Sequence, residues 1–437
     1  MKRTIVALLT LSLMLVSTCF GTNSKGKDIK FPPPPPKDPS DQLQPLSKSL
    51  QVDIFLDGSG SMQGFVVPGD FTIYAKALQV LQDTAITGSS DGQPTFTKFG
   101  TVLTKLGEQG FTKAVLPAFY NEQETLIDKV FEAASDKNLT VLVTDLFQNE
   151  ADTALLIEKV KDKYLHTGLA VGIVGIRSQF SGQVYDIGIE GRDFKYNGLR
   201  PFYMILLGKH ADIANFYELL QHNGLNKFSD THFIILSPYL VSQVPSFAGA
   251  QFESMKKMVE VTNLVPDGVQ DNRLRQFRLK AETGNFRVAL EPEVLPYTLG
   301  YDGNQLDTSI NIKKFNHGKL VPLSPDSNLI EVGGFATEKL KTGTPKLVFD
   351  TEFHGLPDQG VYLFEITLFP KLNAYNNPPW FSAWDMKTEQ IAEWQKDPTK
   401  FEGNTTLNLE RLLTGLWQAN WEIHKPKVAH IFCYVEN

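Results

Sequence analysis

Short apolar runs alternate with helix-like stripes between residues 51 and 240, and this alternation constrains the fold more than any other feature of the chain. The runs have the length of strands that are buried on both faces. They lie at residues 52–56, 96–103, 139–144, 169–176, 202–207 and 232–236. The stripes lie at residues 73–85, 126–134, 155–164 and 213–220. This order predicts an α/β domain over residues 49–240, with a doubly wound, mostly parallel sheet of Rossmann-like type.

Beyond residue 241 the helical stripes fade and strand-like runs follow one another closely. These runs lie at residues 259–264, 276–280, 286–290, 309–313, 329–332, 346–349, 361–369 and 428–435. The gaps are too short for parallel crossovers, so residues 241–437 are expected to form a β-rich, sandwich-like domain. Two C-terminal helices are expected at residues 386–396 and 408–423. Five tryptophans in this region are expected to pack these helices onto the sandwich.

The N-terminus has the features of an export signal over residues 1–21. Lys2 and Arg3 precede an apolar run, residues 5–16, that is too short to span a membrane. Two cleavage sites fit: a lipoprotein-type site that makes Cys19 a lipidated first residue, or a site after Gly21. Both predict a protein of the bacterial envelope, in the periplasm, at the outer membrane or at the cell surface. Residues 22–48 contain five consecutive prolines and are expected to form an extended linker.

Composition excludes several classes of function. The net charge is −7 and no basic stretch stands out, which disfavours nucleic-acid binding. Two cysteines, Cys19 and Cys433, cannot build a disulfide framework. The eight histidines show no zinc-binding spacing.

The motif with the clearest chemistry follows the first predicted strand. Asp57, Ser59 and Ser61 are spaced by two, which can turn three side-chain oxygens toward one point on a loop. Gly58 and Gly60 are expected to permit a tight, unusual backbone path. One carboxylate and two hydroxyls suit Mg²⁺, or else Mn²⁺ or Ca²⁺, rather than zinc. Asp145 also follows a predicted strand, and ligands of such sheets lie beyond the carboxyl ends of the strands.

The string Asp57-Gly58-Ser59-Gly60-Ser61-Met62 resembles the metal-ion-dependent adhesion site of von Willebrand factor A (VWA) domains. This resemblance covers residues 49–240 and implies two more metal ligands, a threonine and a later aspartate. Asp145 matches the aspartate, although Leu146 stands where the family often has glycine. Thr125 opens a predicted helix and matches the threonine, with Thr112 as the alternative. The resemblance also implies that a carboxylate from a partner protein completes the coordination of the metal.

These features predict a metal-dependent adhesion or assembly protein that is not an enzyme. A different class of function is a hydrolase with its active site in the C-terminal domain and a VWA-like domain that recruits the substrate. The closest signal for that alternative is Asp350-Thr351-Glu352, which resembles the first motif of two-metal exonucleases.

Overall fold

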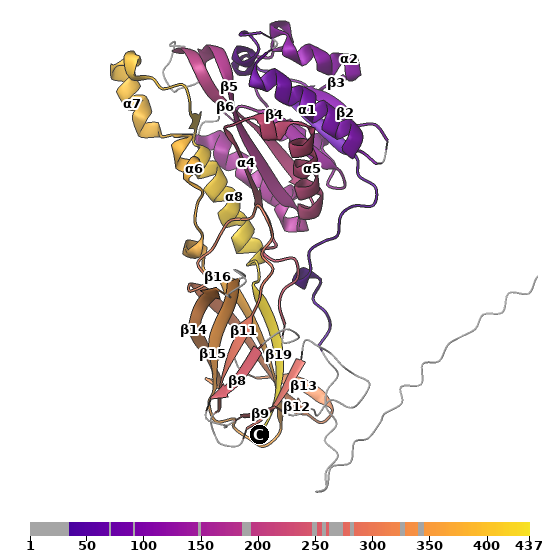
Figure 1. The fold of residues 1–437 in the computed structure, drawn as a ribbon, viewed down its shortest axis with the longest axis vertical. Helices are drawn as coiled ribbons and strands as arrows, with labels where there is room; N and C mark the ends of the chain where they lie inside the picture. Colours follow the sequence, from indigo (N-terminus) through magenta and orange to yellow (C-terminus); the bar gives the residue numbers. More distant parts are fainter. Residues whose placement is uncertain are drawn as a thin grey trace, which may run out of the picture.

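The computed structural model describes residues 35–69, 71–90, 92–146, 150–185, 194–246, 251–255, 259–261, 274–279, 284–323, 328–339 and 345–437. Two units lie end to end along its longest axis (Figure 1). The upper unit is an α/β domain and the lower unit is a β-sandwich. The predicted signal segment, residues 1–21, lies outside the described residues, so the structure does not test it.

The α/β domain is built on a seven-stranded sheet with the order β3-β2-β1-β4-β6-β5-β7. Its strands are β1 (Val52–Asp57), β2 (Thr95–Phe99), β3 (Thr104–Leu106), β4 (Leu139–Thr144), β5 (Ala170–Val184), β6 (Phe194–Gly208) and β7 (Thr231–Leu236). Its helices are α1 (Ile73–Gly88), α2 (Glu108–Phe111), α3 (Ile127–Ala133), α4 (Glu150–Lys163) and α5 (His210–Asn223). The predicted α/β class and the alternation of elements are confirmed.

The prediction of a mostly parallel sheet is wrong. Only β1 pairs in parallel, with β2 on one side and β4 on the other. The remaining neighbours in the sheet are antiparallel, because β5 and β6 form a long hairpin and β6 inserts beside β4. The hairpin connection spans only residues 185–193. A parallel crossover needs about a dozen residues or more, so this connection enforces antiparallel pairing.

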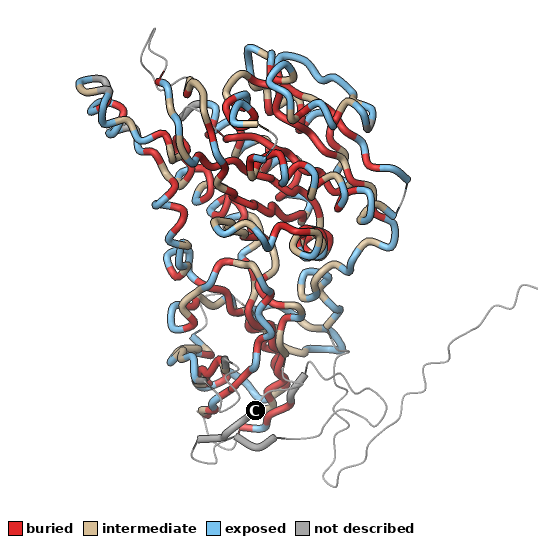
Figure 2. Tube along the Cα trace, turned by 45° about the horizontal axis from the view of Figure 1, so that its top comes forward, coloured by how far each residue is buried: buried red, intermediate tan, exposed pale blue. Residues whose placement is uncertain are grey.

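The two faces of the sheet are covered by different helices. On β1, Ile54 and Leu56 belong to a buried cluster that includes Leu78 of α1 and Phe216 of α5. Phe55 points the other way and joins a cluster with residues of α3, α4 and α8. This alternation is the period-two pattern of a strand buried on both sides. The buried strands form the continuous red centre of the upper unit in Figure 2.

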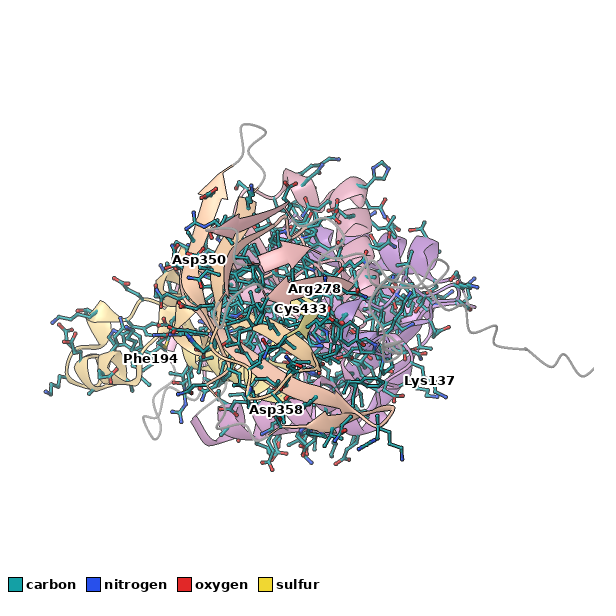
Figure 3. All side chains as sticks on the ribbon, turned by 90° about the horizontal axis from the view of Figure 1, so that it is seen from below. Lys137, Phe194, Arg278, Asp350, Asp358 and Cys433 are labelled. Carbon is teal, nitrogen blue, oxygen red and sulfur yellow. The ribbon has the colours of Figure 1, made fainter. Side chains whose placement is uncertain are left out.

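Two further sheets form the sandwich, with the orders β13-β12-β16-β19-β10-β9 and β14-β15-β11-β8. The strands are β8 (Gln251–Met255), β9 (Val259–Val261), β10 (Leu274–Leu279), β11 (Gly284–Leu290), β12 (Leu306–Asn316), β13 (Lys319–Pro322), β14 (Ile330–Lys339), β15 (Pro345–Phe353), β16 (Val361–Pro370) and β19 (Ala429–Glu436). Except for β10 with β19, their pairs are antiparallel, as expected. Cys433 of β19 is fully buried and lies near the centre of the view from the sandwich end (Figure 3).

The C-terminal helices contact both units, so the expectation that they pack on the sandwich is met in part. Trp421 lies against Phe369 of β16 with the ring centroids 6.4 Å apart, and its Nε1 donates a 2.9 Å hydrogen bond to the Pro370 carbonyl. The elements are α6 (Pro379–Ala383), β17 (Asp385–Met386), α7 (Thr388–Lys396), β18 (Thr406–Leu407) and α8 (Leu409–His424). Trp380 and Trp384 of the α6 region contact His232 on β7 at ring-centroid distances of 5.3 and 4.9 Å. Helix α8 packs on α4 before it leads into β19 of the sandwich, so it joins the two units (Figure 1).

The predicted linker, residues 22–48, is docked over its last part. The Ser47 backbone N–H and hydroxyl both donate 2.7 Å hydrogen bonds to Asp212 at the start of α5. The Leu43 N–H donates to the Ser242 carbonyl at 3.1 Å. Asp38 and Asp41, at the short helix η1 (Pro39–Asp41), contact Lys427 next to β19. Residues 38–48 are therefore part of the folded protein.

Candidate metal site

The candidate site begins at the carboxyl end of β1. Asp57 is the last residue of this strand, and its side chain is fully buried (0% exposed). Its Oδ1 accepts a 2.9 Å hydrogen bond from the Ser59 backbone N–H. The loop then enters η2 (Gly60–Phe65) and is tied to Glu122, which donates to the Gly58 carbonyl and accepts from the Gly60 N–H. These bonds turn the loop back over the end of the strand.

The two glycines of the motif serve a different purpose from the expected one. Neither Gly58 nor Gly60 has a positive φ, so the backbone path needs no glycine for its conformation. At position 58, a Cβ atom would overlap the side chain of Lys98. At position 60, a Cβ atom would lie 3.7 Å from the Tyr185 ring, which is an ordinary contact. Gly58 therefore provides room for Lys98, which forms a 3.2 Å ion pair with Glu122.

The two serine hydroxyls converge on one side of the loop. Ser59 Oγ and Ser61 Oγ are 3.0 Å apart. Both residues line a cavity of about 670 Å³, and Thr125 lines the same cavity. Thr125 lies just before α3, whereas Asp57 and Asp145 are buried and are not among the residues that line this cavity. Thr112 is exposed, donates its hydroxyl to the Gln109 carbonyl and is not part of the cavity lining.

Asp145 reaches the site from the neighbouring parallel strand. β1 pairs with β4 in a register that sets Leu56 opposite Val143, so Asp57 and Thr144 follow at the same sheet edge. Thr144 Oγ1 donates a 2.8 Å hydrogen bond to Asp57 Oδ2. Sequence analysis did not single out Thr144, although its place at the end of β4, next to Asp145, is a signal that could have found it.

Two buried carboxylates at one sheet edge raise the pKa of Asp57. Burial is the largest cause, and the negative charge of Asp145 adds to it, so the Asp57 pKa is about 7. Hydrogen bonds from Ser59 and Thr144 oppose this rise without cancelling it. A nearby cation would stabilise the ionised form of such a carboxyl group.

One cation is already present beside Asp145. The guanidinium of Arg200, on β6, lies 3.8 Å from Asp145 Oδ2, and both side chains are almost completely buried. Arg200 was not predicted from the sequence. It lies 55 positions after Asp145 (200 − 145), and only the insertion of β6 beside β4 brings the two together.

The donor set fits a hard divalent cation. Asp57, Ser59, Ser61, Thr125 and Asp145 offer only oxygen atoms, as Mg²⁺, Mn²⁺ and Ca²⁺ prefer. Asp57 and Asp145 would supply the negative charge, and the hydroxyls of the other three residues would supply neutral ligands. Each Asp57 oxygen accepts a hydrogen bond but has a second lone pair to offer.

Two other acidic groups offer less. Asp38, Asp41 and His430 lie close enough together to hold a metal. However, the Lys427 ammonium lies 2.6 Å from Asp38 and 2.7 Å from Asp41, so a cation already occupies this place. Asp350, labelled in Figure 3, belongs to the exonuclease-like string and forms a bidentate ion pair with Arg287. Its charge is thereby compensated.

No family model, curated protein or solved structure matches this chain. Within the described part of the chain, no helix has the length and apolar character needed to cross a membrane.

Proposed function

We propose that this protein binds a partner protein through a divalent metal held by Asp57, Ser59, Ser61, Thr125 and Asp145, as VWA domains do. Mg²⁺ is the first choice of metal, with Mn²⁺ or Ca²⁺ as alternatives. A carboxylate of the partner completes the coordination. The protein acts in the bacterial envelope as an adhesion or assembly factor and not as an enzyme. Its N-terminal signal directs export, with a lipid anchor at Cys19 if the lipoprotein-type cleavage site is used.

One observation carries this proposal. Asp57 and Asp145 lie at the ends of neighbouring parallel strands, and their mutual repulsion helps raise the pKa of Asp57 to about 7. The converging hydroxyls of Ser59 and Ser61 open onto the same cavity as Thr125. Carboxylates and hydroxyls favour a hard cation, and a partner would reach this cation through the cavity that the hydroxyl-bearing residues line.

The backbone after Asp145 adds independent support. Leu146 adopts a left-handed conformation with φ of 51°, which glycine adopts most easily. VWA domains often have glycine at this position. Leu146 therefore differs from the glycine of VWA domains in its side chain, but its backbone has a conformation that suits glycine.

The first experiment measures thermal unfolding with and without Mg²⁺ or Mn²⁺. At about 100 times the dissociation constant, a metal stabilises the folded state by about 2.7 kcal/mol, so the melting temperature should rise by a few degrees. Asp57→Ala should abolish this rise. Asp350→Ala is the matched control, since it removes a half-exposed aspartate from the sandwich and should leave the rise unchanged. A wild-type protein that shows no rise would overturn the metal site.

The second experiment identifies the partner by a pull-down from envelope extract, with Mg²⁺ or with a chelator. The wild type should retain a partner only with Mg²⁺, and a folded Asp57→Ala variant should retain none. Substitution of the contacting Asp or Glu on the captured partner should also abolish binding. Equal capture in the presence of the chelator would contradict the proposed mechanism.

A further inference from the structure

Arg200 is a fully buried arginine (1% exposed) next to the candidate metal site. Its guanidinium pairs with Asp145 at 3.8 Å and lies over the ring of Phe180, 5.5 Å from the ring centroid. An arginine remains charged under all ordinary conditions, so this position contributes a permanent positive charge. Burial of such a charge is costly unless the surrounding groups compensate for it.

The C-terminal segment holds Arg200 in place. Arg200 Nη1 donates to the Gly403 carbonyl at 2.9 Å and to the Thr405 carbonyl at 3.4 Å. The next residue, Thr406, accepts a 2.9 Å hydrogen bond from the Tyr203 hydroxyl at its Oγ1. Residues 403–406 thus form a strap across β6 that directs the guanidinium toward Asp145. The Arg200 guanidinium is thus held by Asp145 and by the carbonyls of the strap.

The sum of the charges shows what this arginine changes. With Asp57 and Asp145 ionised, a divalent metal alone would make the buried site neutral. Arg200 adds one positive charge, so the metal-loaded site has a net charge of +1. A buried excess charge attracts one anion strongly because the local dielectric constant is low. A single carboxylate from outside would restore neutrality.

We propose that Arg200 sets the charge of this site, so that the metal is held moderately and, once bound, attracts a carboxylate from the partner. This inference rests on the proposed function. Arg200 is a specificity-determining residue that acts on the metal through space and through Asp145. The strap of residues 403–406 is the part of the chain that positions it.

Calorimetric titration of the purified protein tests this inference, first with Mg²⁺ alone and then with acetate added to the Mg²⁺-loaded protein. Arg200→Gln removes the charge but keeps an amide that can donate to the strap. It should bind Mg²⁺ at least about tenfold more tightly than the wild type and acetate at least about tenfold more weakly. Arg200→Lys keeps the charge and should remain within a few-fold of the wild type in both titrations.

Arg177→Gln is the matched control. Arg177 lies on β5, its guanidinium stacks on Trp384 at 4.7 Å, and it donates to the Asn404 carbonyl of the same strap at 3.4 Å. Its acidic partner is Asp230 rather than Asp145. Arg177→Gln should therefore leave both affinities unchanged. A change equal to that of Arg200→Gln would assign the effect to the strap alone and overturn the role of the Arg200 charge.

A second comparison remains informative even if Arg200→Gln does not fold. Asp145→Asn leaves Arg200 without its carboxylate, whereas Asp145→Asn with Arg200→Gln removes both buried charges. The double variant should bind Mg²⁺ more tightly than Asp145→Asn. Equal or weaker binding by the double variant overturns the inference. Failure of the wild type to bind Mg²⁺ overturns the proposed function, and tight binding by Arg200→Gln in that case would still support the role of Arg200.

Discussion

Leu146 combines a strained backbone with a buried side chain. Its φ of 51° lies in the left-handed region, and its side chain is 1% exposed within the cluster that also contains Phe55 and Leu156. A left-handed conformation costs a residue with a Cβ atom about 1–2 kcal/mol. The residue therefore retains this conformation because burial of its side chain offsets the strain.

At position 146, a glycine variant should be more stable than an alanine variant, which is the reverse of the usual order of stability. Leu146→Ala loses the buried side chain and should lower the free energy of unfolding by about 2–5 kcal/mol. Leu146→Gly loses the same contacts but relieves the strain, so it should be more stable than the alanine variant by about 1 kcal/mol. Urea unfolding with a chelator present measures both values. If the alanine variant were at least as stable as the glycine variant, the backbone at position 146 would not be strained.

The sequence could predict the residues of the site that belong to a local motif. Asp57, Ser59 and Ser61 lie within five positions, and Asp145 follows a clear apolar run. The prediction of Thr125 as a ligand depended on the family resemblance. Thr125 lines the cavity and Thr112 does not. Arg200 could not be predicted, because its contact with Asp145 exists only through the pairing of β6 with β4.

At the scale of elements, η2 packs against β5 through two glycines. A Cβ atom at Gly64 would overlap the ring of Phe180, and a Cβ atom at Gly182 would lie 2.9 Å from the Gly64 Cα. The Phe180 ring is itself buried against Phe65, with the ring centroids 5.0 Å apart. The loop that bears Ser59 and Ser61 is thus fixed in position by close contact between η2 and β5.

Gly64→Ala should disturb this contact and destabilise the protein by about 1–3 kcal/mol. Gly60→Ala is the matched control in the same element, because the nearest described atom to its new methyl group belongs to the Tyr185 ring, at an ordinary contact distance of 3.7 Å. Its free energy of unfolding should remain within about 0.5 kcal/mol of the wild-type value. Chemical denaturation without metal compares the two variants, and equal stability would show that the Phe180 ring moves aside at little cost.

The order of the elements was easier to predict than their pairing. Apolar runs located the strands, but β5 and β6 extend well beyond the runs expected at 169–176 and 202–207. The extensions, Arg177 to Val184 and Phe194 to Pro201, contain polar residues that conceal the strands from a search for apolar runs. The predicted parallel sheet rested on the alternation of strands and helices, and no helical stripe lies between the runs at 169–176 and 202–207. The missing stripe is the signal in the sequence for the hairpin of β5 and β6.

At the scale of the whole molecule, a cluster of charges fastens the N-terminal segment to the sandwich. His430 on β19 lies 2.6 Å from Asp41 and 3.1 Å from Glu365 of β16. Lys427 contacts Asp38 and Asp41, and Lys313 lies 3.8 Å from Glu365. The cluster therefore fixes residues 38–41 to the sandwich.

The pKa of His430 gives this attachment a definite dependence on pH. Burial lowers this pKa, but hydrogen bonds to Asp41 and Glu365 outweigh burial and raise it above the ordinary value. The folded state therefore holds the His430 proton more tightly than the unfolded state. The resulting stability is complete below the unfolded pKa of about 6.5 and is lost as the pH rises through the higher folded pKa. His430→Gln should cost about 1–3 kcal/mol near pH 5.5 and less above pH 8.

His424 provides the opposite case in the same chain. Burial of its ring lowers its pKa, and the hydrogen bond from Nε2 to the Leu165 carbonyl at 2.6 Å opposes this shift without cancelling it. Its neutral form is favoured in the folded state, so its contribution is present above about pH 6.5 and falls as the pH drops. His424→Gln should therefore cost more at pH 8 than at pH 5.5. Urea unfolding of both variants at the two pH values compares them. If the two costs changed in the same direction, pairing of His430 with Asp41 and Glu365 would not control the attachment, because a general effect of pH on the fold would account for both.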